Sequence, residues 1–376
     1  MPMYNGLTSR EGFTADVLAR WVGRTVLNPA LLLPIILAAR YTKKGEDMSI
    51  LHHKAYSRIK TLFYIGLLRW INNWHSRRAA NNFVSDTYHW RREIAIVTGG
   101  SGGIGGHIAQ LLAEKGLTVV VLDIQPLTYS APSNIHFYTC DLTSPSTLSK
   151  VADRIRKDIG QPTILINNAG VARGKTLLDA TEKDIRFTYD VNTLAHFWTA
   201  KEFLPYMIQR NHGMVVTVAS FASWLNVPNM VDYASSKAAA QSFHEGLAAE
   251  LVTRYHAPRV RMILVNQGFT KTALFDGYKN DSWFVAPSLH PETVAEAVVR
   301  QVLSGQSGQV IVPGLGNILS GIHGWPIWVQ HGMRKKYESL MVEFRGRQVV
   351  EDLDGFYKRR DGEGGTEESG VLVPEK

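Results

Sequence analysis

Residues 94–105 of the chain read IAIVTGGSGGIG, a short apolar run followed by a glycine-rich turn. The first four residues have the β-branched content of a buried strand, and a run of helical period opens after the turn and continues through Leu112. Glycines at such a junction permit a tight turn and let a pyrophosphate approach backbone N–H groups at the helix N-terminus. The stretch therefore predicts a strand, a nucleotide-binding turn and a helix.

The chain beyond this stretch repeats the alternation of short apolar runs with longer stretches of helical period. This alternation is typical of βαβ units, whose right-handed crossovers build a parallel sheet with ligands at the carboxyl ends of its strands. We therefore expect an α/β fold with a doubly wound, seven-stranded parallel sheet. The strands are expected at residues 94–97, 119–122, 136–138, 164–166, 214–218, 260–265 and 310–312.

The composition excludes several classes of protein. With 376 residues, of which 45% are apolar and 20% charged, the chain can bury a full core and is not a disordered protein. Its single cysteine, Cys140, excludes a disulfide framework and a cysteine-rich zinc module, and it fits a reducing compartment. The 13 histidines form no ligand-spaced cluster, so no metal site is expected.

The excess of basic residues lies entirely before the sheet. Residues 1–97 carry 14 Lys and Arg against 6 Asp and Glu, whereas residues 98–376 carry 27 of each sign. The balanced main domain disfavours nucleic-acid binding. The basic segment contains the apolar run TVLNPALLLPIILAA (25–39) between Arg24 and Arg40, and basic flanks around an apolar run indicate a membrane.

The mode of membrane contact stays open. The run is 15 residues long, shorter than the roughly 20 that a spanning helix needs, and it contains Pro29 and Pro34. A re-entrant hairpin or an interfacial helix is therefore at least as consistent as a span. A second apolar stretch, LFYIGLLRWI (62–71), with Trp70 and Trp74, fits either the membrane interface or an amphipathic helix packed on the main domain.

Asp123 ends the second expected strand, 24 residues after Gly99. A carboxylate at this place can accept hydrogen bonds from the adenosine ribose hydroxyls of a dinucleotide, and it would repel the 2′-phosphate of NADP. No Lys or Arg follows Asp123 closely. The expected cofactor is therefore NAD, with NADP possible.

Tyr233 and Lys237 lie four residues apart in a run of helical period and therefore share one helix face. An ammonium beside a phenol favours the phenolate, so the pKa of Tyr233 is expected to fall from about 10 towards neutral pH. Ser220 ends the preceding strand, 13 residues before Tyr233. The connection can bring both hydroxyls to one sheet edge, where the serine can hydrogen-bond a substrate carbonyl oxygen.

These motifs resemble those of the short-chain dehydrogenase/reductase family, in its compact single-domain branch, over residues 94–312. Residues 98–105 match its TGxxxGxG cofactor loop, residues 167–170 match its NNAG motif, and Asn192 matches its helix-borne asparagine. The resemblance implies a Rossmann-like fold in which NNAG supports the central sheet and Asp141 lies beside the adenine ring. The residues expected to contact the cofactor are Gly99, Ser101, Gly103, Ile104, Gly105, Asp123, Asp141, Asn168, Ala169, Gly170, Tyr233, Lys237, Gly268, Thr270 and Thr272.

The catalytic set of the family is complete in Ser220, Tyr233, Lys237 and Asn192. By this resemblance, Tyr233 is the general acid or base on the substrate oxygen while hydride passes between the substrate and the nicotinamide. Lys237 would bind the nicotinamide ribose and lower the pKa of Tyr233, and Ser220 would orient the substrate oxygen. Asn192 would hold a water that links Lys237 to solvent.

The chain departs from the family after the sixth strand. The family usually has Pro-Gly there, followed by an aliphatic residue at the cofactor carboxamide and then Thr. Here Gln267 replaces the proline and Thr270 the aliphatic residue, while Gly268 and Thr272 remain. The nicotinamide side of the site is therefore expected to differ from the family pattern.

Two aromatic segments indicate a lipophilic substrate. Residues 273–290 contain Phe275 and Tyr278 and occupy the position of the family's substrate lid, although a packed surface loop is an equal alternative. Residues 318–329 (ILSGIHGWPIWV) fit either a second interfacial element or a helix that closes the pocket. Together with the N-terminal segment, they resemble the membrane- and lipid-droplet-associated subgroup that oxidises retinols, steroids and long-chain alcohols.

We therefore divide the chain into a membrane-associating segment with hydrophobic helices (1–92), a Rossmann-fold catalytic domain (93–313), an amphipathic and hydrophobic extension (314–354) and a disordered tail (355–376). The expected protein is an NAD(P)-dependent oxidoreductase of a retinoid, steroid, long-chain alcohol or secondary metabolite. We expect it at the endoplasmic reticulum or a lipid droplet, facing the cytosol, and as a homodimer through the helices that carry Asn192 and Tyr233. The alternative is a membrane-bound scaffold or lipid-binding protein without turnover. The complete catalytic set disfavours it.

Overall fold

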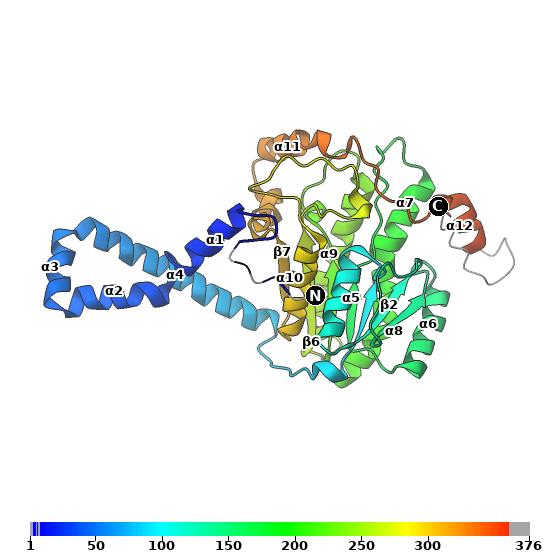
Figure 1. The fold of residues 1–376 in the computed structure, drawn as a ribbon, viewed down its shortest axis with the longest axis horizontal. Coiled ribbons are helices and arrows are strands. Elements are labelled where there is room, and N and C mark those ends of the chain that lie inside the picture. The colour runs from blue at the N-terminus through cyan, green and yellow to red at the C-terminus, as the bar shows by residue number, and fades with distance from the viewer. Residues whose placement is uncertain (1–2, 5, 7, 361–376) are drawn as a thin grey trace.

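The seven apolar runs form one parallel sheet in the order β3-β2-β1-β4-β5-β6-β7, with helices on both faces (Figure 1). The computed structural model describes residues 3, 4, 6 and 8–360. The expected doubly wound α/β fold is confirmed. The strands are β1 (Ile94–Thr98), β2 (Thr118–Asp123), β3 (Ile135–Thr139), β4 (Ile164–Asn167), β5 (Gly213–Val218), β6 (Val260–Gln267) and β7 (Gly308–Val312).

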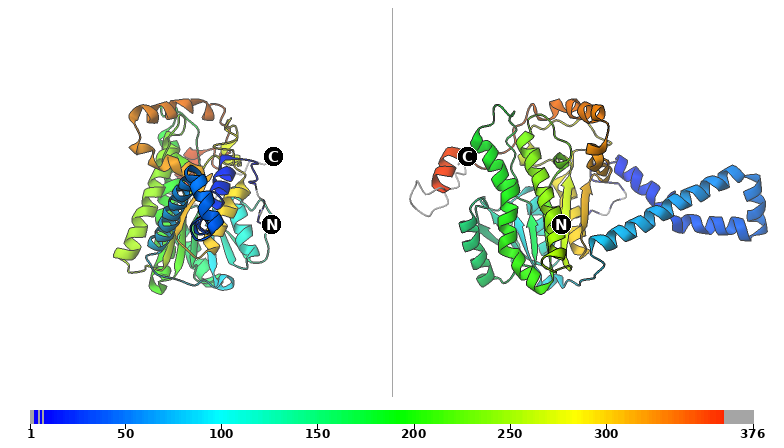
Figure 2. Two further views of the ribbon diagram at one scale, coloured as in Figure 1. Left: turned by 90° about the vertical axis from the view of Figure 1, so that its left-hand side faces the viewer. Right: turned by 180° about the vertical axis from the view of Figure 1, so that it is seen from behind.

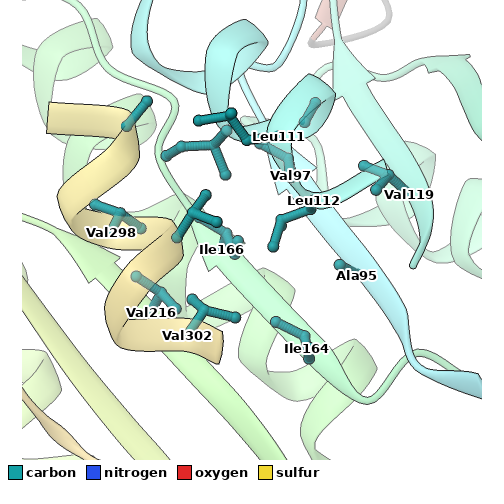
Figure 3. Packing of buried hydrophobic residues seen from close by; sticks show 14 of the residues in the cluster. Ala95, Val97, Leu111, Leu112, Val119, Ile164, Ile166, Val216, Val298 and Val302 are labelled. Atoms are coloured by element: carbon teal, nitrogen blue, oxygen red, sulfur yellow. The ribbon is translucent and has the colours of Figure 1, made fainter. Parts of the chain in front are cut away.

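The inner strands are apolar on both faces because each face is covered by helices. One face packs against α5 (Gly103–Glu114) and α10 (Pro291–Leu303), where Leu112 and Val298 meet Val97 and Val216 (Figure 3). The other face carries a separate cluster with side chains from three helices. These helices are α6 (Pro145–Asp158), α8 (Ala195–Arg210) and α9 (Val231–Thr253).

The order of the strands reverses at β1, which pairs with β2 on one side and with β4 on the other. In a doubly wound sheet this reversal opens a crevice at the carboxyl ends of the strands, where ligands bind. The chain after β4 crosses this edge and then forms α7 (Glu182–Tyr189), a π-helical turn (Asp190–Leu194) and α8. The reversal thus positions the site described below.

The N-terminal segment is a helical hairpin that projects from the domain (Figures 1 and 2). Its helices α2 and α4 contact each other, and α3 joins them at the end far from the sheet, where Figure 1 shows the two helices spread apart. Asn28 caps α2 by accepting a hydrogen bond from the N–H of Ala30, and Pro29 opens the helix. The helices are α1 (Ala15–Arg24), α2 (Pro29–Tyr41), α3 (Lys43–Leu51) and α4 (His53–Ala80), and the short η1 (Trp90–Arg92) leads into β1.

Many apolar side chains of the hairpin are exposed, among them Leu31, Ile35 and Leu68. Within the part of the chain that the structure describes, one segment, Ala15–Tyr41, has the length and mean hydropathy (1.6) of a membrane span, by length and composition alone. The alternative in which residues 62–71 pack on the main domain is wrong, because Tyr64, Leu68 and Trp70 are at least 60% exposed. These residues lie on the projecting part of α4.

The chain after β7 runs across the top of the domain through η5 (Gly314–Gly324), α11 (Ile327–Lys336) and η6 (Glu338–Met341) to α12 (Leu353–Arg360) (Figure 1). The prediction of disorder from residue 355 is wrong for residues 355–360. Tyr357 is buried in a cluster with Val171 and Phe187, and its hydroxyl donates a hydrogen bond to Asp190. The rest of the predicted tail, residues 361–376, lies outside the described residues.

Candidate active site

The glycine turn after β1 has a backbone that side chains would not tolerate. Gly99 and Gly103 have φ angles of 63° and 56°, in the left-handed region that favours glycine. A Cβ atom on Gly105 would lie 2.2 Å from the carbonyl oxygen of Gly99. The turn therefore closes tightly and leaves the N-terminus of α5 open at the carboxyl edge of the sheet, as anion binding requires.

Asn168 ties this turn to β4. Its amide Nδ2 donates hydrogen bonds to the carbonyl oxygens of Thr98 and Gly99, each at 3.0 Å. In return, the hydroxyl oxygen of Thr98 accepts hydrogen bonds from the N–H groups of Asn168 (3.0 Å) and Ala169 (3.1 Å). The carboxyl ends of β1 and β4, which are neighbours in the sheet, are thereby held in fixed positions relative to each other.

The carboxylate of Asp123 is held at the end of β2. Its two oxygens accept hydrogen bonds from the N–H groups of Ser101 (3.0 Å) and Gln125 (3.1 Å). Asp141, one strand further along the sheet, accepts hydrogen bonds from the N–H and the hydroxyl of Thr143. Both carboxylates line the same cavity as the glycine turn.

Ser220, Tyr233 and Lys237 meet at the other end of this cavity. The Lys237 ammonium donates a hydrogen bond to the carbonyl oxygen of Val218 at 2.9 Å and lies 5.9 Å from the centre of the Tyr233 ring. The Ser220 hydroxyl accepts a hydrogen bond from the N–H of Ala222, which orients it at the end of β5. Tyr233 and Lys237 are each 3% exposed.

The electrostatics of this pair differ from the expectation that Lys237 lowers the pKa of Tyr233. Burial raises the pKa of Tyr233 to about 12, although the Ser220 hydroxyl opposes this shift. Burial also lowers the pKa of Lys237 to about 8. The Lys237 ammonium donates its hydrogen bond to the carbonyl of Val218, and burial remains the largest influence on the pKa of the phenol.

Asn192 lies in the π-helical turn between α7 and α8 and braces the site from behind. Its side chain accepts a hydrogen bond from the N–H of Val171 (2.8 Å) and donates to the carbonyl of Val171 (2.9 Å) and to the Ser236 hydroxyl (3.0 Å). A Cβ on Gly170 would lie 3.3 Å from Asn192 Oδ1 and 3.4 Å from Lys237 Nζ. Asn192 thus positions the chain beside Lys237 and does not line the cavity.

One cavity of about 400 Å³ joins these parts. Every residue that the sequence assigned to catalysis or to the cofactor lines it, except Gly105 and Asn192, which hold its walls. Beyond Tyr233 the wall is apolar and aromatic, and much of it was missed by the sequence analysis. The missed wall residues include Leu225, Val227, Met230, Tyr337, Leu340, Arg347, Val349 and Phe356.

The loop at residues 273–290 lies over the phenol. The ring of Phe275 meets the ring of Tyr233 edge-on, with 5.4 Å between centroids, and Tyr278 stacks on Phe269 at 3.9 Å. Phe344, from the C-terminal segment, packs against Phe275 from outside. Contacts between residues so far apart in the chain had no signal in the sequence.

The cavity residues fit a nicotinamide dinucleotide. The open N-terminus of α5 suits a pyrophosphate, and the fixed carboxylate of Asp123 suits a ribose diol. Lys237 and Tyr233 line the same continuous cavity as this turn, so the nicotinamide half of one bound dinucleotide can lie beside them. The site therefore pairs a dinucleotide groove with a phenol and an apolar chamber.

Comparisons with known proteins agree with this geometry. A family model described as short chain dehydrogenase matches residues 93–283. Dehydrogenase RED2 of Cochliobolus heterostrophus (strain C4 / ATCC 48331 / race T) is 46% identical over 208 residues, which cover 54% of this chain and 78% of that protein. Epidermal retinol dehydrogenase 2 of Homo sapiens is 33% identical over 56% of this chain and 71% of its own length.

Two further matches extend the comparison. Estradiol 17-beta-dehydrogenase 11 of Rattus norvegicus is 34% identical over 59% of this chain and 76% of its own length. Among solved structures, the ligand-free aldohexose dehydrogenase of Thermoplasma acidophilum superimposes with a TM-score of 0.51 and 23% identity, over 59% of this chain and 93% of that one. This last likeness concerns the fold alone.

Proposed function

The chain belongs to the short-chain dehydrogenase family and is an NAD(P)-dependent oxidoreductase of alcohol or carbonyl groups; from this premise we propose that it acts on a lipophilic alcohol or ketone at a membrane surface, with NAD as its preferred cofactor. The observation that carries the proposal is the single cavity that runs from the glycine turn past Tyr233 into an apolar chamber.

In this proposal Tyr233 moves the proton and Ser220 holds the substrate oxygen. The bound cofactor supplies or accepts a hydride at its nicotinamide ring. Burial raises the pKa of Tyr233 to about 12, so the phenol can donate its proton to a carbonyl oxygen that gains negative charge; in alcohol oxidation, the reverse step, the phenolate takes the proton of the substrate hydroxyl. With a pKa of about 8, Lys237 is mostly protonated at neutral pH and can bind ribose hydroxyls.

The preference for NAD follows from the surroundings of Asp123. Its carboxylate is fixed by two backbone N–H groups and faces the cavity, where a 2′-phosphate would meet a like charge. Among the described residues, the cavity wall contains the cationic side chains of Lys237 and Arg347 only. The ammonium of Lys237 donates its hydrogen bond to the carbonyl of Val218 in β5, at the opposite end of the cavity from Asp123.

The lipophilic substrate follows from the chamber beyond Tyr233. Its wall contains Val227, Met230, Phe275, Leu319 and Leu340, which offer dispersion contacts and few polar partners. The names of two relatives, a retinol dehydrogenase and an estradiol dehydrogenase, point to the same class of substrate. An elongated apolar alcohol would place its hydroxyl at Ser220 and Tyr233 and its chain in this chamber.

The membrane surface follows from the hairpin. The side chains of Leu31, Leu33, Ile35 and Leu37 are 42–52% exposed, and lipid would remove this apolar area from water. At about 1.5 Å per residue, α2 is roughly 20 Å long, shorter than the hydrocarbon core of about 30 Å. We therefore assign the hairpin to one leaflet of an endoplasmic reticulum or lipid-droplet membrane.

A substrate screen with a catalytic variant tests the proposal. The purified full chain is assayed with a retinol, a steroid alcohol and a long-chain alcohol, with NAD and NADP in turn, by nicotinamide absorbance. We expect turnover with NAD and at least one of these substrates, and a loss of at least about hundredfold in Tyr233→Phe with NADH binding retained. Turnover that is unchanged in Tyr233→Phe would overturn the assignment of the phenol.

A further inference from the structure

The side chain of Gln267, the last residue of β6, contributes to the cavity wall, and its amide oxygen has no hydrogen-bond partner among the described residues. The side chain lines the cavity and is 9% exposed. Its Oε1 is buried and accepts no hydrogen bond from any described residue. A buried polar atom without a partner is costly and rare, so it calls for a ligand group that completes it.

The alternation of side chains along β6 shows which part of the cavity Gln267 faces. Asn266 faces α9, because its Nδ2 donates to Gln241 Oε1 at 3.2 Å. Ile263 and Val265 lie on the opposite face, in the cluster formed with α5 and α10. Gln267 follows Val265 by two residues and so shares the α5 face, away from the helix that carries Tyr233.

The backbone at this position is held on both sides. Gln267 is in register with Val312 of β7, and the next residue, Gly268, donates its N–H to the Val312 carbonyl at 2.7 Å. A Cβ on Gly268 would meet Phe221 and Pro313 at 3.3 Å, so the chain beyond β6 is closely packed as well. The amide of Gln267 is therefore presented from a rigid element, as a positioning group must be.

We propose that the side-chain amide of Gln267 pairs with the carboxamide of the nicotinamide ring and sets the orientation of that ring. This inference rests on the proposed dinucleotide function. A carboxamide has one acceptor and two donors, so it complements the amide of a glutamine whichever way that amide is turned. The α5 face, with Ile104 and Val218 in the same wall, is the cofactor side of the cavity, whereas the substrate oxygen belongs at Tyr233 and Ser220.

Binding measurements separate the nicotinamide end from the rest of the cofactor. The affinity of the full chain for NADH and for ADP-ribose, which lacks the nicotinamide, is measured by tryptophan fluorescence in wild type and Gln267→Leu. We expect the Kd for NADH to rise about tenfold in the variant, while the Kd for ADP-ribose stays within about twofold. Gln309→Leu, an exposed position on β7, is the matched control and should change neither.

A cofactor analogue sharpens the test. In the 3-acetylpyridine analogue of NADH a methyl group replaces the amide nitrogen, so the ring keeps its acceptor and loses its donors. Wild type should bind this analogue about tenfold more weakly than NADH, and Gln267→Leu should bind the two equally. Equal discrimination in both proteins, or an unchanged NADH affinity in Gln267→Leu, would overturn the proposal. A wild type that binds neither ADP-ribose nor NADH would overturn the dinucleotide function on which it rests.

Discussion

Tyr233 and Lys237 are buried to the same extent, and burial shifts the pKa of each side chain towards its neutral form. For the phenol the neutral form is protonated, whereas for the amine it is deprotonated. The site thus supplies a proton donor of high pKa next to a lysine that gives up its proton more readily than usual. The two shifts affect stability in separate ranges of pH.

The first prediction concerns stability between about pH 8 and pH 10. The unfolded chain holds the Lys237 proton up to about pH 10.5, but the folded chain releases it near pH 8, so the free energy of unfolding from this residue rises with pH across that window. The gain is on the order of 3 kcal/mol. Urea unfolding of wild type and Lys237→Met should show this rise in wild type only; a rise of equal size in both proteins would contradict it.

The carboxylate of Asp184 accepts hydrogen bonds from three residues, Arg173, Lys175 and Thr181. Burial alone would raise the pKa of its carboxyl, but hydrogen bonds from Lys175, Thr181 and Arg173 outweigh burial and hold that pKa well below its usual range. Arg173 Nε lies 2.7 Å from Asp184 Oδ1. The Arg173 guanidinium also donates hydrogen bonds to the side-chain oxygen of Gln348 and to the carbonyl of Val350. One buried ion pair therefore links α7 to the C-terminal segment that lines the cavity.

At the level of elements, we expect the Arg173–Asp184 ion pair and the capped N-terminus of α7 to contribute to the free energy of unfolding. Asp184→Asn removes the charge that Arg173 needs and weakens the capping box at Thr181, so the free energy of unfolding should fall by about 3 kcal/mol. Urea denaturation measures it. Asp354→Asn, which breaks the exposed pair with Lys183, is the control and should leave the midpoint unchanged. If both variants lowered the free energy of unfolding equally, the burial of Asp184 would not explain its contribution to stability.

From the exposed apolar side chains of α2 we expect the protein to bind lipid vesicles through this helix. Charged residues cost about 2.5–3.5 kcal/mol each at the centre of a membrane helix, so Leu33→Glu with Ile35→Glu should lower binding to phosphatidylcholine vesicles by at least about hundredfold in a flotation assay. Leu178→Glu is the control, because Leu178 is 95% exposed on the domain. If the double variant floats as wild type does, α2 is not the lipid-binding element.

At the scale of the whole molecule, α1 connects three parts of the chain. The N–H of Ala15 donates a hydrogen bond to the carbonyl of Phe284 at 2.9 Å, in the loop over Tyr233. The carboxylate of Asp16 accepts hydrogen bonds from the N–H groups of Gly314 and Leu315 at the start of η5. The base of the hairpin is thus bonded to two segments whose residues line the cavity.

From the hydrogen bonds of Asp16 to η5 we expect a substitution at Asp16 to change the KM for the substrate, although Asp16 lies outside the site of reaction. Asp16→Ala frees the first N–H groups of η5, so the KM for a long-chain alcohol carried in vesicles should rise several-fold while kcat changes little. A short, water-soluble alcohol serves as the control substrate and should show no change in KM. A parallel fall of kcat for both substrates would instead indicate damage to the catalytic residues.

The sheet and the meeting of Ser220, Tyr233 and Lys237 at one cavity could be predicted because their signals are local. Each inner strand is buried on both faces and therefore reads as a continuous apolar run, and the spacing of Tyr233 and Lys237 places both on one helix face. The pKa of Tyr233 could not be predicted, because it depends on how deeply the folded chain buries the phenol. The chamber wall at Tyr337 and Phe356 was missed for a similar reason: these residues come from segments without regular periodicity, placed by contacts distant in sequence.

The bond between α1 and the loop at Phe284 has a practical consequence for anyone who purifies this protein. Detergent that replaces lipid around the hairpin acts on the same helix that supports the roof of the chamber. If the hairpin binds lipid as proposed, we expect rate constants measured in micelles to differ from those measured on a bilayer. Reconstitution belongs at the start of its enzymology.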